Sequence, residues 1–254
     1  MTTETAHHPS GPLFLALSLA GVAGFIDAHL FLHVTNVFVA NMSGNMVRVG
    51  ILTGSGDWDI AAGSVASLFA FGAGVVTAIA HHDSQLRQDK LVRPDDLLVV
   101  EALLTLSLPI ILMVGNVEFS NQPGAVQYLV ISVGAFAMGI QASSLRRVGS
   151  IAVATTYGTG TIVRIGEKVA LALRRAERHS VDRRSATILL LVGVLGCYVG
   201  GASVAAALGS SPLLLLIPSG VLLASAAYVR WSAGFRVAFA ESRVRRSERR
   251  TIDY

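Results

Sequence analysis

The sequence has few charged side chains. Of its 254 residues, 14% are Asp, Glu, Lys or Arg and 52% are hydrophobic, and the mean hydropathy is +0.60. Globular chains average about 25% charged residues, so this chain has too few charges to coat a water-soluble particle of its size. The same numbers exclude a disordered chain. The missing polar surface predicts contact with lipid.

Cysteine and the common catalytic motifs are also scarce. Cys197 is the single cysteine, so an internal disulfide and a cysteine metal cluster are excluded. Neither a phosphate-binding Gly-x-x-x-x-Gly-Lys-Ser/Thr loop nor a His-Glu-x-x-His zinc motif occurs. A hydrolase that combines His29 or His33 with Ser43 would lack a nucleophile elbow. We therefore expect no enzymatic activity, no catalytic residues, no cofactor and no metal site.

Six apolar runs have about the length that crosses a hydrocarbon core, roughly 20 residues. The segment before the first run contains no Lys or Arg, which argues against a cleaved signal peptide and for a retained first span. The runs predict an all-α membrane protein with spans at Pro12–His33, Ile60–Ala80, Leu97–Gly115, Ala125–Leu145, Ala186–Leu208 and Pro212–Val229.

The basic residues alternate between the two sides of these spans. Three Lys or Arg lie between the second and third spans, nine between the fourth and fifth, and six after Trp231, whereas the other connections hold one or none. The positive-inside rule makes the rich side cytoplasmic and places both termini there. We expect a multi-pass protein of a bacterial inner membrane. Its regions are a cytoplasmic tail (1–11), a first membrane repeat (12–115), an external loop (116–124), a second repeat (125–230) and a basic cytoplasmic tail (231–254).

Two stretches of the chain repeat each other at an offset of 116 residues. They are VFVANMSGNMVRVG, which starts at Val37, and VATTYGTGTIVRIG, which starts at Val153, and five of their fourteen positions are identical. The match extends to Gly24 and Gly139, and to FGAG from Phe71 and YVGG from Tyr198. A duplicated fold is the physical explanation for such periodicity.

The duplication has an odd number of spans in each half. Each half is ordered as span, motif, span, span, so the two halves would enter the membrane in opposite orientations. Inverted repeats of this kind are typical of secondary transporters, in which paired helix interruptions build a solute site near the midplane. Each motif combines Gly with Ser, Thr or Asn, and a helix that starts near Ser43 or Thr159 would direct free amides toward a polar solute or an anion.

The candidate solute or ion site joins both motifs with intramembrane polar residues. An alternative is that the motifs are ordinary tight loops. The candidates are Asp27, Asn41, Ser43, Gly44, Asn45, Arg48, Gln141, Thr155, Thr156, Thr159, Gly160, Thr161 and Arg164.

Asp27 is the strongest single candidate, because placing a carboxylate inside a membrane span costs free energy and such residues are usually functional. Arg48 and Arg164 are candidate partners for it, and Gln141 lies one position from its equivalent in the second half. The alternative role for Asp27 is to cap the motif that follows it.

These residues also carry a resemblance. Gly24 to Ala28, Phe38 to Asn45, Gly139 to Ala142, Thr155-Thr156 and Thr159 to Thr161 together resemble the YoaK family of uncharacterised bacterial membrane proteins over roughly residues 14 to 230. The resemblance implies a polytopic membrane protein of about six helices and implies no substrate.

The functional prediction is a small-solute transporter or channel, with Asp27 as proton or cation partner. The alternative is a membrane scaffold or sensor that binds a cytosolic partner or anionic lipid through its Arg-rich fourth loop and tail. The expected partners are the lipid bilayer and an unidentified small solute or ion, with a homo-oligomer left open. Nucleic acid is not expected, because membrane orientation already explains the Arg residues.

Overall fold

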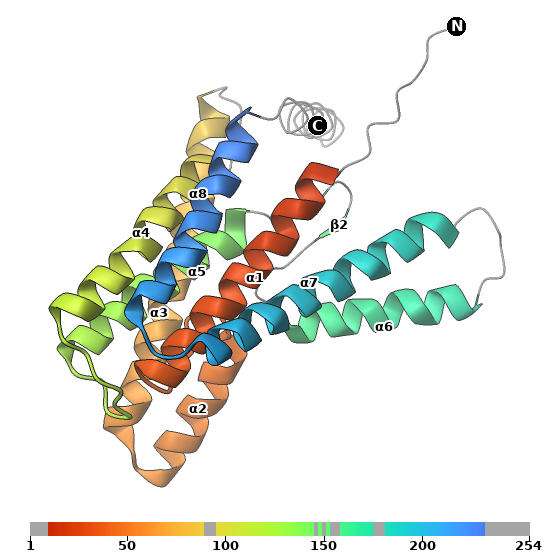
Figure 1. The fold of residues 1–254 in the computed structure, drawn as a ribbon. Helices are drawn as coiled ribbons and strands as arrows, with labels where there is room; N and C mark the ends of the chain where they lie inside the picture. Colours follow the sequence, from red (N-terminus) through yellow and green to blue (C-terminus); the bar gives the residue numbers. More distant parts are fainter. Residues whose placement is uncertain are drawn as a thin grey trace, which may run out of the picture.

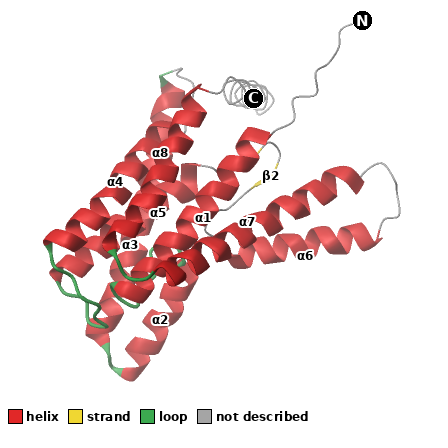
Figure 2. Ribbon diagram, in the orientation of Figure 1, coloured by secondary structure: helices red, strands yellow, loops and turns green. Residues whose placement is uncertain are grey.

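The structure is a computed structural model, and it describes residues 10–88, 95–144, 147–148, 151–152, 158–174 and 181–231. Apart from one pair of two-residue strands, its regular elements are helices (Figures 1 and 2). In chain order they are α1 (Ser10–His33), α2 (Met42–Ser55), α3 (Trp58–Arg87), α4 (Asp95–Val114), α5 (Ala125–Ser144), β1 (Arg147–Val148), β2 (Ile151–Ala152), α6 (Gly158–Arg174), α7 (Val181–Leu208), the 3₁₀ helix η2 (Pro212–Leu215) and α8 (Leu216–Trp231).

Six helical segments of the described chain are long and apolar enough to cross a membrane. They are Leu13–His33, Trp58–Gln85, Asp95–Val114, Ala125–Ser144, Thr187–Leu208 and Pro212–Trp231. Each overlaps one of the predicted spans, so the all-α fold class with six spans is confirmed. The predicted starts of the two motif helices, near Ser43 and Thr159, are each within one residue of the observed starts of α2 and α6.

The helices of the two halves pair across the molecule. α1 lies against α7, and α5 lies against α3, so the first helix of each half packs on the third helix of the other half. α4 packs against α8, and the remaining large contacts are α2 with α3 and α6 with α7. In Figure 1 the α2–α3 hairpin projects at the bottom and the α6–α7 hairpin at the right.

Glycines permit these helix pairs to approach closely. A Cβ added to Gly24 would overlap the backbone of Tyr198, and one added to Gly139 would overlap the backbone of Phe71. These are the positions that correspond in the internal sequence repeat. The second contact of each pair, Gly201 on Gly21 and Gly74 on Phe136, also joins residues at the same offsets of 127 and 115.

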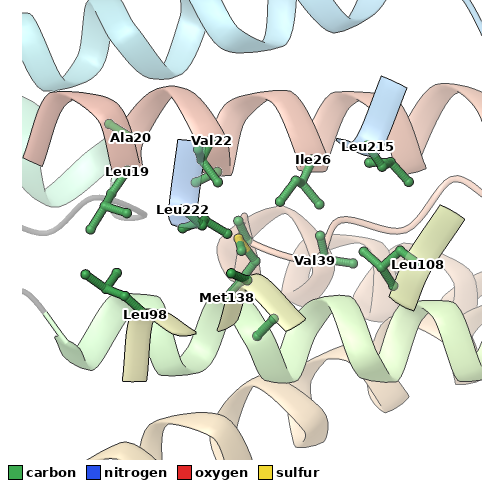
Figure 3. Close-up of a cluster of buried hydrophobic side chains, with 14 of the residues drawn as sticks. Leu19, Ala20, Val22, Ile26, Val39, Leu98, Leu108, Met138, Leu215 and Leu222 are labelled. Atoms are coloured by element: carbon green, nitrogen blue, oxygen red, sulfur yellow. The ribbon is translucent and has the colours of Figure 1, made fainter. Parts of the chain in front are cut away.

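The buried core lies where α1 and α5 face each other between α4 and α8. Figure 3 shows Leu19, Val22 and Ile26 of α1 opposite Met138 of α5, with side chains from α4, η2 and α8 filling the space between them. Because α1 is buried on several sides, its polar residues lie inside the protein and not at the lipid surface. Asp27 and His29, which are 2% and 0% exposed, are therefore shielded from solvent, and only other protein groups could hydrogen-bond to them.

Candidate functional site

Asp27 binds the chain segment that leads into α2. Its Oδ1 accepts hydrogen bonds from the backbone amides of Val39 at 2.6 Å and Ala40 at 2.8 Å. Its Oδ2 accepts one from the amide of Asn41 at 3.0 Å and one from the hydroxyl of Tyr198 at 2.5 Å. Four donors thus point at the two oxygens, and a proton on this carboxyl would have to displace one of them.

This arrangement matches the alternative role considered for Asp27, which was to hold the motif that follows. The amides that precede α2, which the sequence suggested as a site for an anion, donate to the protein's own carboxylate. Arg48, a predicted partner of Asp27, instead directs its Nε to Ser64 Oγ at 3.4 Å. The negative charge of Asp27 is therefore stabilised by backbone dipoles and one hydroxyl.

Asn45 of α2 hydrogen-bonds to the same segment, at the backbone of Phe38. Its Nδ2 donates to the carbonyl of Phe38 at 2.6 Å, and its Oδ1 accepts from the amide of Phe38 at 3.1 Å. Ser67 of α3 completes the contact, since its hydroxyl donates to the Phe38 carbonyl at 2.7 Å and accepts from Asn45 Nδ2 at 3.0 Å. We call the set Asp27, Asn45, Ser67 and Tyr198 the polar clamp, because it ties α1, α2, α3 and α7 to residues 38–41.

The first turn of α2 is capped locally. Asn41 accepts hydrogen bonds through its Oδ1 from the amide of Gly44 at 3.2 Å and from the hydroxyl of Ser43 at 2.8 Å, as an N-cap residue does. The ring of Phe38 lies over Gly44, where an added Cβ would come within 2.9 Å of two ring carbons. Glycine and asparagine are therefore needed at these positions to shape the start of the helix.

The second motif is described only in its helical part. Thr155 and Thr156 lie outside the described residues, and Thr159, Gly160 and Thr161 form the first turn of α6. Thr161, the counterpart of Asn45, is 3% exposed, whereas Gly160 and Arg164 are exposed. Helix α6 packs on α7, the helix that carries Tyr198, so α7 contacts both motif regions.

Gln141 links the two halves instead of lying beside Asp27. It is fully buried, and its Nε2 donates to the carbonyl of Leu19 in α1 at 2.8 Å. Its Oε1 has no hydrogen-bond partner among the described residues.

Sequence reasoning missed Tyr198 and Ser67. The internal repeat contained a usable signal for Tyr198, because its counterpart is Phe71, which lacks the hydroxyl, just as Ala142 at the Asp27 position lacks the carboxylate. The acid and the phenol thus meet in the α1–α7 pair, and both are absent from the equivalent α5–α3 pair. No local pattern marks Ser67, which lies 22 residues after Asn45 on the next helix.

Several further polar side chains are buried without hydrogen-bond partners in the described part of the chain, and His29 and Glu101 are the titratable ones in which both polar atoms are affected. Both ring nitrogens of His29 and both carboxyl oxygens of Glu101 lack hydrogen bonds, although each side chain is fully buried. His29 is stacked on Phe25, with ring centroids 6.2 Å apart, and lies edge-on to His33 at 5.1 Å. A buried polar atom without a partner usually marks a functional group or an absent ligand.

An apolar groove of about 710 Å³ runs between α1, α7 and α8. Gly196 and Gly200, which have the Gly-x-x-x-Gly spacing of closely packed membrane helices, line it, but a Cβ added to either would meet no neighbouring atom within 4 Å. Close packing is made by Gly201 instead. The lining is apolar apart from Ser18 and Cys197, so the groove has few groups that could bind an ion.

The fold and these buried polar groups define a class: the chain is a polytopic transmembrane protein with six apolar helices. It belongs to the family described as "Protein of unknown function (DUF1275)", whose model matches residues 15–228. It is similar to the UPF0700 transmembrane protein YoaK of Bacillus subtilis (strain 168), with 27% identity over 179 residues that cover 68% of this chain and 76% of the relative. No solved structure matches the chain.

Proposed function

We propose that this protein is a small-solute transporter of the bacterial inner membrane built from two inverted repeats, with both termini in the cytoplasm. The observation that carries the proposal is the reciprocal pairing of the halves, in which α1 packs on α7 and α5 packs on α3 through glycines at corresponding positions. Two equivalent helix pairs of this kind can rock against each other, which is how inverted-repeat transporters alternate access to a site between the repeats.

The two hairpins support the same proposal. α2 follows the first helix of its half and packs on α3, and α6 follows the first helix of its half and packs on α7. In an inverted duplication the α2–α3 tip faces outside and the α6–α7 tip faces the cytoplasm. The charge at the end of α6 and in the segment that follows it, with Arg174, Arg175 and Arg178, is consistent with that orientation.

The orientation can be tested with single cysteines in a Cys197→Ser background. Ser55→Cys is placed at the exposed tip of the α2–α3 hairpin and Arg174→Cys at the end of α6. In intact cells, a membrane-impermeant maleimide should label Ser55→Cys only, and Arg174→Cys should label after the cells are opened. If both cysteines react from the same side, the halves are not inverted and the transporter proposal loses its main support.

Transport itself is tested with the purified full chain in liposomes of phosphatidylethanolamine and phosphatidylglycerol. A trapped pH dye and light scattering would follow small carboxylates, amines, sugars and inorganic anions, with protein-free liposomes as control. Flux of at least one class supports the proposal. If no class moves, and if deletion of Arg243 to Tyr254 abolishes function in cells, the protein is a scaffold or sensor that acts through its basic tail.

A further inference from the structure

Glu101 is buried within the apolar span Asp95–Val114, and its carboxyl has no ion-pair partner among the described residues. It belongs to the buried face of α4, together with Leu98, Thr105 and Leu108, and all four side chains are fully buried. Figure 3 shows Leu98 and Leu108 in the core that α4 shares with α1, α5 and α8. Neither carboxyl oxygen of Glu101 has a hydrogen-bond partner among the described residues. An ionised carboxylate in such a place would have neither water nor a donor, so the group carries its proton in this structure.

Few titratable side chains lie on the helices around α4. α5, α8 and η2 make the larger contacts with it, and their titratable side chains are Tyr128 on α5 and Tyr228 and Arg230 on α8. α3 also meets α4, since Ala78 and Leu97 share a buried cluster and Gln85 donates to Asp96, and it carries His81, His82 and Asp83 within one turn of Gln85. α1 shares the core with α4 and carries Asp27, His29 and His33. None of these side chains is a hydrogen-bond partner of the Glu101 carboxyl. In Figure 3 Leu98 lies toward Leu222 and Leu108 toward Leu215, so α4 and α8 run in opposite directions.

Because the two helices are antiparallel, Arg230 lies past the N-terminal end of α4, and Glu101 lies inside the helix on the other side of that end. It is eight residues past Leu222, about 12 Å along the helix. Glu101 lies six residues, about 9 Å, inside α4 from Asp95, and the acidic residues Asp95 and Asp96 are the other titratable groups of that helix.

Two polar groups follow Glu101 along the same face. The hydroxyl of Thr105 donates to the backbone carbonyl of Glu101 at 2.9 Å. Pro109, one turn further, has no N–H, so the carbonyl of Thr105 lacks the helix hydrogen bond that any other residue would donate. The acid is thus followed, one turn away, by a carbonyl with spare acceptor capacity.

The ligand that fits Glu101 is a proton and not a metal ion. A metal cation needs several oxygen ligands around it, and no group of three or more His, Cys, Asp and Glu that could hold one occurs among the described residues. A proton needs one oxygen. Uptake adds one proton to a carboxylate oxygen and removes one negative charge, and release reverses this, with no other reactant.

We infer that Glu101, and not Asp27, is the side chain that takes up and releases the proton that drives transport by this protein. The inference rests on the proposed transport function. Asp27 accepts hydrogen bonds from three backbone amides and from the Tyr198 hydroxyl, so protonation there would force at least one of these hydrogen bonds to rearrange. Glu101 breaks no hydrogen bond when it changes charge, which is what a group that cycles between states requires.

The first test is chemical labelling of the full-length protein in liposomes with dicyclohexylcarbodiimide. This apolar reagent adds the O–H of a protonated carboxyl across its C=N bond, and the adduct rearranges to a stable N-acylurea without a leaving group. Intact mass should show one adduct, and peptide mapping should place it on Glu101. Glu101→Gln should reduce labelling to background, while Asp27→Asn should retain it. Labelling of another acid with Glu101 unmodified would overturn the inference.

The second test separates the inference from the transport proposal. Glu101→Gln preserves the shape and neutrality of the protonated acid, so it should fold like the parent protein and lose only proton-driven flux, whereas Glu101→Asp should retain part of it. If flux occurs and Glu101→Gln does not change it, the inference is wrong and the transport proposal stands. If Glu101 is labelled but no solute or proton moves, Glu101 is a static neutral acid, and both proposals are wrong.

Discussion

Two adjacent glycines of α7 provide a stringent test of the packing that unites the halves. An added Cβ at Gly201 would come within 2.9 Å of the Gly21 carbonyl carbon and 3.1 Å of its Cα, with the carbonyl oxygen nearer still. An added Cβ at Gly200 meets nothing within 4 Å. The same substitution one residue apart therefore probes a helix contact and an open surface.

The expected effects have opposite signs. Gly200→Ala removes a flexible residue from a helix and should stabilise the protein by about 0.5–1 kcal/mol. Gly201→Ala has the same propensity gain, but it places a methyl group against backbone, and ordinary contact at 3.4–4 Å requires α1 and α7 to separate by about an ångström. Overpacking of this kind costs about 1–3 kcal/mol.

The measurement is thermal unfolding of detergent-purified protein, followed by the fluorescence of Trp58 and Trp231. A difference of about 1–3 kcal/mol between the two variants corresponds to a gap in Tm of about 2–12 °C for a chain of this size. Gly72→Ala and Gly74→Ala repeat the comparison on α3, where Gly72 is open and Gly74 lies on the backbone of Phe136. Equal Tm values within either pair would refute the close helix packing described here.

Three further substitutions probe individual side chains. Tyr198→Phe removes the hydroxyl donor to Asp27 Oδ2 and should cost about 1.5–3 kcal/mol, since the acceptor is charged; a chemical denaturation midpoint equal to that of the parent would contradict the polar clamp. Asn45→Ala leaves the amide and carbonyl of Phe38 with fewer partners and should cost about 1–3 kcal/mol. Proteolysis near residues 34–41 should then accelerate, and unchanged cleavage rates would count against this role. Glu101→Met replaces an unpaired buried acid by an apolar side chain of similar volume and should raise Tm, because the desolvation cost of the carboxyl disappears; a lower Tm would mean that Glu101 has a partner.

Much of the helical architecture was predictable because membrane insertion depends on local composition. The six predicted spans overlap the six observed ones, since about 20 apolar residues are needed wherever they occur. The start of α2 was predictable for a similar reason, because Asn41, Ser43 and Gly44 are capping residues that act within one turn.

The role of Asp27 was not predictable from its neighbours in sequence. Arg48 and Arg164, the partners predicted for it, carry the opposite charge, but Arg48 contacts Ser64 and neither arginine is among the groups that hydrogen-bond to Asp27. The observed donors are three backbone amides 12 to 14 residues away and a phenol 171 residues away. Every residue except proline has a backbone amide, so the residue types of a loop do not show which amides will bind a carboxylate. A search for residues of opposite charge therefore could not identify these donors.

The sequence by itself determined the spans, because they depend on residue type and order along one chain, and it predicts the sidedness and the duplication on the same basis. Only the tertiary structure decided that α1 pairs with α7 and α5 with α3, because such contacts depend on glycines of distant helices meeting face to face. It also separated two buried acids. Among the described residues Asp27 meets four donors and Glu101 meets none, and a carboxyl group inside a membrane is stabilised or left neutral according to the donors that surround it.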